Sequence, residues 1–333
     1  MKLGFMCPPI NNAYYRAIIP MRALESRGHT VVWPTRLGED TPTRDLLTCD
    51  LVHCYRRGDR TEDLKQLGDR GVAITFDNDD DFALAEVSDG GSGLAGNRYN
   101  RKIARRLLQA AGQCDLVTTP SEVLADSYRR SGIEHAVVIP NYLDRGMFGF
   151  GSTSRHVGVV VGWVAGREHQ LDLERVPILN ALRQLLDAHE DLRVLTVGLR
   201  LPLRSDRYEH VERVEYPDLL KAIGRIDIGV APLADSAFNR SRSDVKLKEY
   251  GAGGACWLAS PVGPYRDLGE KQGGSLVADG EWFEAIDRLL RSDRTRRRLA
   301  KRALKWARQQ TVDKHAQLWE SAFLAAMSRA QEQ

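Results

Sequence analysis

The sequence has no run of about 18 apolar residues, so no segment is predicted to span a membrane. It contains five cysteines, an odd number, and no C-x-x-C pair. All five lie in or beside predicted strands, where cysteine is usually a small buried hydrophobe. These features exclude a disulfide-rich secreted domain and predict a reducing, cytoplasmic location. The cysteines are Cys7, Cys49, Cys54, Cys114 and Cys256.

An excess of charge of one sign is also absent. Lys and Arg number 48 against 45 Asp and Glu, which gives a net charge of +3. That balance is too even to predict a nucleic-acid partner, and the basic run at 291–305 has no interleaved aromatic residues for base stacking. At the start of the chain, Pro8 comes too early for the apolar core of a signal peptide, which fits the expected cytoplasmic location.

Short apolar runs alternate with helical patterns along the whole chain. Such alternation predicts an α/β protein with parallel sheets covered by helices on both faces. Twelve strands are too many for one such sheet, and a single core rarely grows past about 250–300 residues. We therefore predict two six-stranded, doubly wound, Rossmann-like domains. The predicted strands are Lys2–Cys7, Thr30–Trp33, Leu51–Tyr55, Val72–Phe76, Leu116–Thr119, Ala136–Ile139, Val157–Val164, Arg193–Val197, Val211–Glu215, Ile226–Ala231, Ala255–Ala259 and Ser275–Val277.

The expected domain boundary lies near Asp144–Arg155, where DRGMFGFGSTSR is rich in Gly and Ser and lacks periodicity. This divides the chain into a first domain at 1–148 and a second domain at 156–312. Open α/β sheets bind ligands outside the carboxyl ends of their strands, so we expect ligands in a cleft between the two domains.

The most specific segment, 231–254, reads APLADSAFNRSRSDVKLKEYGAGG and follows the apolar run Ile226–Val230. We predict a strand, a polar loop and a helix that opens near Ser243. On that helix Lys246 and Glu249 share a face. A helix start and a Lys suit phosphate, whereas a Glu accepts hydrogen bonds from vicinal hydroxyls. The pattern indicates a nucleoside-diphosphate site, and the alternative is a solvated Lys–Glu pair.

At these residues the chain resembles the GT-B glycosyltransferases of the GT4 type, whose C-terminal halves carry a similar P-L…F-N…S-x-x-K-L-x-E-Y-x-A-x-G run. The resemblance implies that Lys246 contacts the donor diphosphate and Glu249 the ribose. It implies transfer of a sugar, with retention, from a nucleotide sugar such as a UDP or GDP sugar. It also implies that a helix at 313–333 packs on the first domain. Many relatives carry a second Glu where this chain has Ser241, which leaves open how the sugar hydroxyls are held.

Other donor contacts are expected where the strand at 157–164 breaks. Gly166 permits close backbone approach, and the planar fork of Arg167 suits phosphate oxygens. Arg167 and Lys246 would then stabilise the departing diphosphate as catalytic residues. Tyr216 is a candidate to stack on the base. The predicted donor-binding residues are Glu249, Lys246, Arg167, Gly166, Ser243, Asn239 and Tyr216.

Acceptor candidates lie in the first domain. The loop PPINNAYYR follows the first strand, and positions 15–29 match a Y-R-x-x-x-P-x-x-x-L-x-x-x-G-H pattern of the resembled family. We expect Asn11, Asn12 and Arg16 to contact the acceptor or donor, with a capping or surface role as the alternative. His53, at a strand end, is a candidate catalytic residue in the cleft, although a lone His there is more often structural.

The cluster DNDDD at 77–81 follows the fourth strand. We expect Asp79 to act in acid–base catalysis and Asp79 with Asp80 to bind the acceptor. One alternative is helix capping, and another is the D-x-D metal motif of the GT-A architecture, which implies manganese. The predicted donor-binding residues all lie in the second domain, away from this cluster. We therefore expect no metal and no cofactor besides the nucleotide sugar.

Two further segments have patterns that occur in functional sites. GSGLAG at 91–96 has the form G-x-G-x-x-G, but it lies far from the preceding strand, so we predict a mobile loop. The helix at 97–111 is basic and amphipathic, which suggests peripheral contact with the inner membrane face or, as the alternative, a solvated surface. A nucleotide-sugar epimerase and a silent binding protein remain alternative functions. Ser241 weighs against the epimerase, which needs carboxylates near the sugar.

Overall fold

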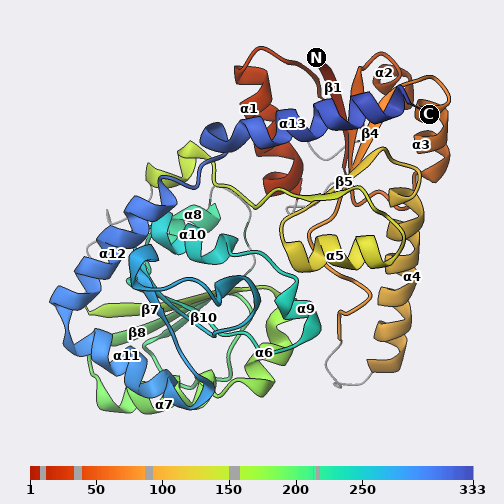
Figure 1. The fold of residues 1–333 in the computed structure, drawn as a ribbon. Helices are drawn as coiled ribbons and strands as arrows, with labels where there is room; N and C mark the ends of the chain where they lie inside the picture. The colour runs from red at the N-terminus through yellow and green to blue at the C-terminus, as the bar shows by residue number, and fades with distance from the viewer. Residues whose placement is uncertain are drawn as a thin grey trace. The chain divides into compact units, whose positions relative to one another are not determined.

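The computed structural model describes residues 1–7, 13–33, 40–86, 93–149, 158–212, 214 and 218–332. The chain divides into two compact units, each with its own parallel β-sheet (Figure 1). The first unit comprises residues 1–142, 241–243 and 312–333, and the second comprises residues 143–240 and 244–311. Each unit has hydrophobic clusters on both faces of its sheet, as expected when helices cover a parallel sheet on both sides.

The first unit contains a six-stranded parallel sheet in the order β2-β1-β3-β4-β5-β6. Helices α1 and α13 pack against each other and share one hydrophobic cluster, whereas α4 and α5 contribute to the cluster that contains Val52, Ile74 and Val117. A π-helix, Tyr14–Ile18, leads into α1. The elements of this unit are β1 (Lys2–Met6), α1 (Ile19–Ser26), β2 (Thr30–Val32), α2 (Thr43–Leu46), β3 (Leu51–Tyr55), α3 (Thr61–Gly68), β4 (Ala73–Asp77), α4 (Gly93–Ala111), β5 (Leu116–Thr119), α5 (Glu122–Arg130), β6 (Ala136–Val138) and α13 (Val312–Ala330).

The second unit also contains a six-stranded parallel sheet, in the order β12-β11-β10-β7-β8-β9. Helix α7 illustrates how the sequence folds locally, because its buried residues Ile178, Ala181, Leu182 and Leu185 recur at helical spacing. The elements are β7 (Val159–Ala165), α6 (Gln170–Arg175), α7 (Ile178–Ala188), β8 (Leu192–Gly198), β9 (Tyr208–Val211), α8 (Asp218–Ile223), β10 (Ile228–Ala231), α9 (Ala237–Arg240), α10 (Val245–Ala252), β11 (Cys256–Ala259), β12 (Gly274–Leu276), α11 (Trp282–Arg291) and α12 (Asp293–Ala307).

The strand orders indicate where ligands bind. Counted from its own first strand, the second sheet runs 6-5-4-1-2-3, which is the Rossmann order, and its direction of winding changes between β7 and β10. In the first sheet the change falls between β1 and β3. Ligands of open α/β sheets occupy the crevice at the carboxyl end of such a switch point.

Two sequence predictions differ from the structure. The edge strand expected at Val211–Glu215 overlaps β9, Tyr208–Val211, only at Val211, because Tyr208 and His210 both hydrogen-bond Thr196 of β8; residues 213 and 215 of the expected range lie outside the described residues. The loop expected at GSGLAG is partly wrong, since α4 begins at Gly93 and continues the amphipathic helix toward the N-terminus. Of the helices described, none is long and apolar enough to cross a membrane.

Candidate functional site

Helix α10 places Lys246 at the carboxyl edge of the second sheet. The ammonium of Lys246 donates a hydrogen bond to the carbonyl oxygen of Val164, the penultimate residue of β7. This carbonyl lies at the switch-point strand, so the positive charge stands where the topology expects a ligand. Glu249, one turn further along α10, is 8% exposed. Lys246 thus lies at the expected edge of the sheet, and Glu249 follows it on the same helix.

Tyr250 fixes α10 to the two strands that flank the switch point. Its hydroxyl accepts a hydrogen bond from the backbone N–H of Val164 at 3.1 Å and donates to the carbonyl of Val230 in β10 at 2.9 Å. Burial raises the pKa of Tyr250 above its usual value, so the hydroxyl keeps the proton that it donates. The ring rests on Gly229, where an added Cβ would lie 2.3 Å from the ring. Glycine is therefore required beneath this tyrosine.

Lys248 has a different task from Lys246. Its ammonium lies 2.7 Å from a carboxylate oxygen of Asp244, the residue that precedes α10, and the lysine is only 1% exposed. A buried cation is stable only when it is paired, so this ion pair explains how α10 carries a lysine on its inner face. Of the two lysines, Lys246 is the one at the ligand edge.

Arg167 follows β7 directly. Strand β7 ends at Ala165, Gly166 is extended, and a short 3₁₀ helix begins at Arg167. The Arg167 side chain is exposed. Lys246 contacts the carbonyl of Val164 near the end of the same strand, so both cations belong to the carboxyl end of β7. That arrangement suits a polyanionic ligand at the switch point.

Asn239, a predicted donor contact, is built into the scaffold. It is 5% exposed, and its amide donates to a carboxylate oxygen of Asp172 at 2.7 Å and to the carbonyl of Ala234 at 2.9 Å. The other oxygen of Asp172 lies 2.7 Å from His169. These contacts tie the loop after β10 to α6, which differs from the donor-binding role that we predicted for Asn239.

Ser241 and Ser243 pack with the first unit. Ser121 donates to the carbonyl of Ser241, and the amide of Asn141 donates to the Ser243 hydroxyl at 3.0 Å. Ser241, the position of the missing Glu, is fully buried. The structure thus gives Ser243 a hydrogen bond to Asn141, whereas we predicted a donor contact.

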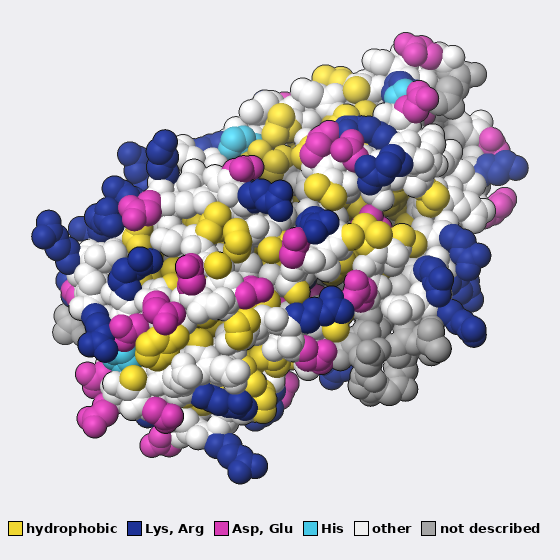
Figure 2. Space-filling view, turned by 60° about the horizontal axis from the view of Figure 1, so that its bottom comes forward, with side chains coloured by type: hydrophobic (Ala, Val, Ile, Leu, Met, Phe, Trp, Pro, Cys, Tyr) yellow, Lys and Arg dark blue, Asp and Glu magenta, His cyan; other side chains and the backbone are white. Residues whose placement is uncertain are grey.

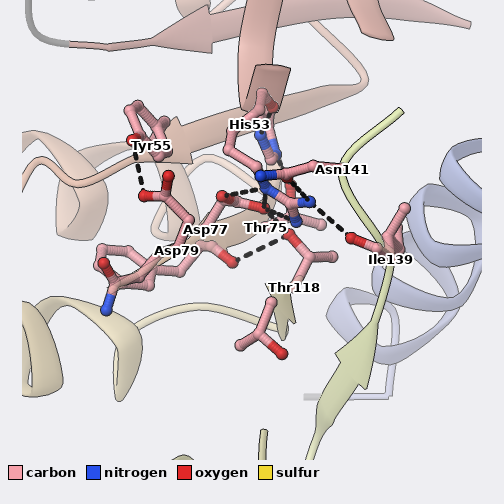
Figure 3. A network of polar contacts seen from close by, with 12 residues as sticks. His53, Tyr55, Thr75, Asp77, Asp79, Thr118, Ile139 and Asn141 are labelled. Atoms are coloured by element: carbon pink, nitrogen blue, oxygen red, sulfur yellow. Dashed lines mark hydrogen bonds and ion pairs between the residues drawn. The ribbon is translucent and has the colours of Figure 1, made fainter. Parts of the chain in front are cut away.

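Arg16 forms the centre of a buried network in the first unit. Figure 3 labels its partners Asp77, Ile139 and Asn141. Its guanidinium contacts both carboxylate oxygens of Asp77, the closest at 2.7 Å, and donates to the Ile139 carbonyl and to the Asn141 side chain. It also lies 5.0 Å from the ring centroid of Trp319 in α13. Arg16 is fully buried, so its geometry is that of a structural ion pair, which corrects the acceptor-binding role that we predicted.

His53 belongs to the same network. Its Nε2 lies 3.0 Å from the Arg16 carbonyl, which only accepts, so this nitrogen carries the hydrogen. Nδ1 then accepts from the Thr75 hydroxyl at 2.9 Å. Burial lowers the pKa of His53, and the ring is fully enclosed. His53 is therefore a neutral structural residue, as the alternative interpretation held, and not the catalytic residue that we predicted.

Asp79 and Asp80 flank Arg56 at the carboxyl ends of β3 and β4. Asp79 accepts from the Tyr55 hydroxyl at 2.7 Å and lies 2.6 Å from Arg56, which also pairs with Asp80. Burial raises the pKa of Asp79 to about 6 against the opposing charge of Arg56. At Asp80 burial is outweighed by Arg56 and Arg242, which lower its pKa. The pair therefore holds one carboxyl able to exchange a proton near neutral pH.

Sequence reasoning missed Arg56. This residue has a φ of +54°, a left-handed backbone that costs a non-glycine residue about 1–3 kcal/mol. Its guanidinium lies 5.0 Å from the Phe82 ring and 5.4 Å from the Tyr55 ring. No local pattern in the sequence predicts such a backbone at Arg56. The nearby carboxylates of Asp79 and Asp80 were the only available hint.

Three predicted contacts, Asn11, Asn12 and Tyr216, lie outside the described residues. Within the described ranges, no group of three or more His, Cys, Asp or Glu side chains is arranged to hold a metal ion.

No protein-family model matches the chain, and no protein of curated function matches it. Solved structures do. Sucrose-phosphate synthase from Thermosynechococcus elongatus superposes with a TM-score of 0.64 and 15% identity over 98% of this chain and 100% of the other. HepE from Anabaena in complex with UDP-glucose superposes with a TM-score of 0.63 and 15% identity, over 96% of this chain and 99% of the other. A putative UDP-N-acetylglucosamine 2-epimerase from Listeria monocytogenes superposes with a TM-score of 0.57 and 11% identity, over 100% of this chain and 97% of the other.

The chain has the GT-B fold. Its two Rossmann-like units and its final helix α13, which belongs to the first unit, agree with the fold class predicted from the sequence. At identities of 10–15% these similarities establish the fold, and function has to be argued from the residues of the site.

Proposed function

We propose that this protein is a glycosyltransferase that moves a sugar from a nucleoside-diphosphate sugar to an acceptor. The observation that carries the proposal is the position of Lys246 at the carboxyl end of β7, beside the switch point of a Rossmann-ordered sheet. The uridine base is favoured because HepE, with the same fold, binds UDP-glucose. The GT4-like sequence around Lys246 and Glu249 supports the same assignment.

In this proposal the cations act on the leaving group. When the bond from sugar to phosphate breaks, negative charge builds up on the diphosphate. Lys246 and Arg167, both at the end of β7, would stabilise that charge without a metal ion. Glu249 would accept hydrogen bonds from the two ribose hydroxyls. Retention of configuration, the mode of the resembled GT4 family, would require attack from the face that the leaving group occupies.

The first test is ligand binding by thermal shift with UDP, GDP, dTDP and ADP, with EDTA present. A ligand at about 100 times its dissociation constant stabilises the folded chain by about 2.7 kcal/mol, which a melting curve resolves. Stabilisation by one nucleotide, abolished by Glu249→Ala, is the expected result. If no nucleotide at millimolar concentration raises the midpoint, the proposed donor site does not exist.

An epimerase is the second candidate, because the Listeria protein with the same fold is described as a putative UDP-N-acetylglucosamine 2-epimerase. The two activities differ in their products. NMR of a reaction with the cognate nucleotide sugar shows either release of the nucleotide or a new epimer still joined to it. Nucleotide release in step with glycosylated acceptor, and with the anomeric coupling of the donor retained, is expected for the transferase.

A further inference from the structure

The first unit contains a cavity of about 740 Å³ beside α4 and α5. This volume is within the 300–1,000 Å³ range of small-molecule sites. Its floor is apolar, with Phe82, Leu107, Leu108, Leu124 and the ring of Tyr128 among the lining residues. The carboxyl end of β4 leads into it through Asn78, so the cavity lies at the edge of the sheet where ligands are expected.

One wall of the cavity is cationic. The lining includes Arg98, Arg101, Lys102 and Arg105 of α4, all exposed. Within the described part of the chain, none of the four forms an ion pair with a carboxylate. Figure 2 shows Lys and Arg side chains gathered on the right of the view, where α4 runs in Figure 1. An unneutralised cationic rim above an apolar floor suits a ligand with an anionic group and an apolar body.

The cavity also contains an unsatisfied carboxylate. Asp81 is 6% exposed; its Oδ1 accepts from the backbone N–H of Ala83 at 3.1 Å, while its Oδ2 has no hydrogen-bond partner among the described residues. The Tyr128 hydroxyl accepts from Asn78 at 3.0 Å, which orients it at the same wall. An orphaned buried carboxylate oxygen is costly unless a ligand donates to it. A hydroxyl is the donor that a sugar acceptor carries.

We propose that this cavity binds the acceptor, a small amphiphile with an apolar body, an anionic group held by α4 and a hydroxyl that donates to Asp81. This inference rests on the proposed function and names the acceptor class for it. Asp81 is a positioning residue that orients the hydroxyl. The ligand would enter as a single molecule, because Asp81 lines the cavity and is 6% exposed, whereas the cations of α4 are exposed.

The test uses three probes that differ by one group: 10-hydroxydecanoate, decanoate and 1,10-decanediol. Calorimetry at low salt should show 10-hydroxydecanoate binding about tenfold more tightly than either analogue, since each lost polar group removes a charge-assisted contact. Asp81→Asn should reduce the preference for 10-hydroxydecanoate over decanoate to less than about twofold. A purely structural role for Asp81 would leave that ratio unchanged and overturn the proposal.

Variants of α4 locate the anionic group. Arg101→Gln with Arg105→Gln should weaken both carboxylate probes about fivefold at low salt and leave the diol unaffected. Arg106→Gln is the matched control, because Arg106 is exposed on the same helix but does not line the cavity. Ala104→Phe should fill the cavity and abolish binding of all three probes. Equal weakening by Arg106→Gln, or unchanged binding in Ala104→Phe, overturns the proposal.

Two further measurements separate the possible failures. UDP is titrated into the same variants, which should bind it like the parent; a parent that binds the probes but no UDP refutes the donor proposal alone. Vesicles containing anionic lipid are tested beside the monomeric probes. Binding to vesicles without binding of 10-hydroxydecanoate would mean that α4 serves a surface, and the cavity proposal would be wrong.

Discussion

Removing the Arg16 side chain should destabilise the first unit more than any surface substitution. Arg16→Met keeps the length of the side chain but leaves the carboxylate of Asp77 buried without its cation. Breaking a buried ion pair on one side costs about 3–5 kcal/mol. The carbonyl of Ile139 and the amide oxygen of Asn141 lose a donor as well. A domain is stable by only about 5–15 kcal/mol in total, so this loss is a large fraction.

A double variant tests the origin of that loss. In Arg16→Met with Asp77→Leu no uncompensated charge remains, and replacement of a buried pair by apolar residues is often neutral. Here recovery should be only partial, because Thr118, Ile139 and Asn141 keep polar groups that the pair had satisfied. Each such buried group left unpaired costs about 1–3 kcal/mol. The double variant should therefore lie between the parent and Arg16→Met.

The assay is thermal unfolding combined with hydrogen exchange, which assigns the loss to one unit. A loss of about 4 kcal/mol should lower the midpoint by roughly 10 °C, with faster exchange in β1 and β4 and unchanged exchange in β7 and β10. Arg27→Gln is the control, because it breaks the exposed pair with Glu320 and should leave the midpoint unchanged. A shift of under about 2 °C for Arg16→Met would refute the reasoning.

Three further outcomes are expected. Lys246→Ala should lower kcat by about 10²–10³-fold, measured under saturating donor; a raised KM with unchanged kcat would mean that its charge binds the ground state and transition state equally. For His53 the folded pKa is lowered from 6.5, so stability should be full above pH 6.5 and fall as the pH drops further. His53→Asn should flatten that part of the curve of melting midpoint against pH, and an unchanged slope would contradict the neutral assignment. The folded pKa of Asp79 is raised from 3.8 to about 6, so stability falls as the pH rises through this range, and Asp79→Asn should raise the midpoint at pH 8 but not at pH 4.

The buried strands were the part of the fold that the sequence predicted best. Leu51–Tyr55 and Leu116–Thr119 have the predicted bounds, and every residue of both strands is buried. The edge strand β9 was displaced, since none of its residues is buried and its position depends on the hydrogen bonds of Tyr208 and His210 to Thr196. The π-helix before α1 depends on tertiary packing and has no local signal.

The parts of the candidate site that depend on residue spacing within one helix could be predicted from the sequence. The parts that depend on contacts between distant segments could not. The spacing of Lys246 and Glu249 was sufficient to place both on one helix, and Lys246 reaches the end of β7. Arg and His are residue types that often act in catalysis, so the sequence alone does not show that Arg16 and His53 are structural. Arg16 is structural because it pairs with Asp77, which lies 61 positions away along the chain. Nothing in the sequence shows that Asp81 would lack a partner, because the cavity around it is formed by α4 and α5.

The assignment of residues 241–243 to the first unit means that the two units are interlaced. The chain passes between them at 142/143, at 240/241, at 243/244 and again at 311/312. A fragment that begins after the Gly-rich segment and ends before α13 would therefore carry Ser241 and Ser243 away from the groups of Ser121 and Asn141 that satisfy them. Exchange of whole halves between such proteins has to carry a compatible tripeptide as well as a compatible final helix.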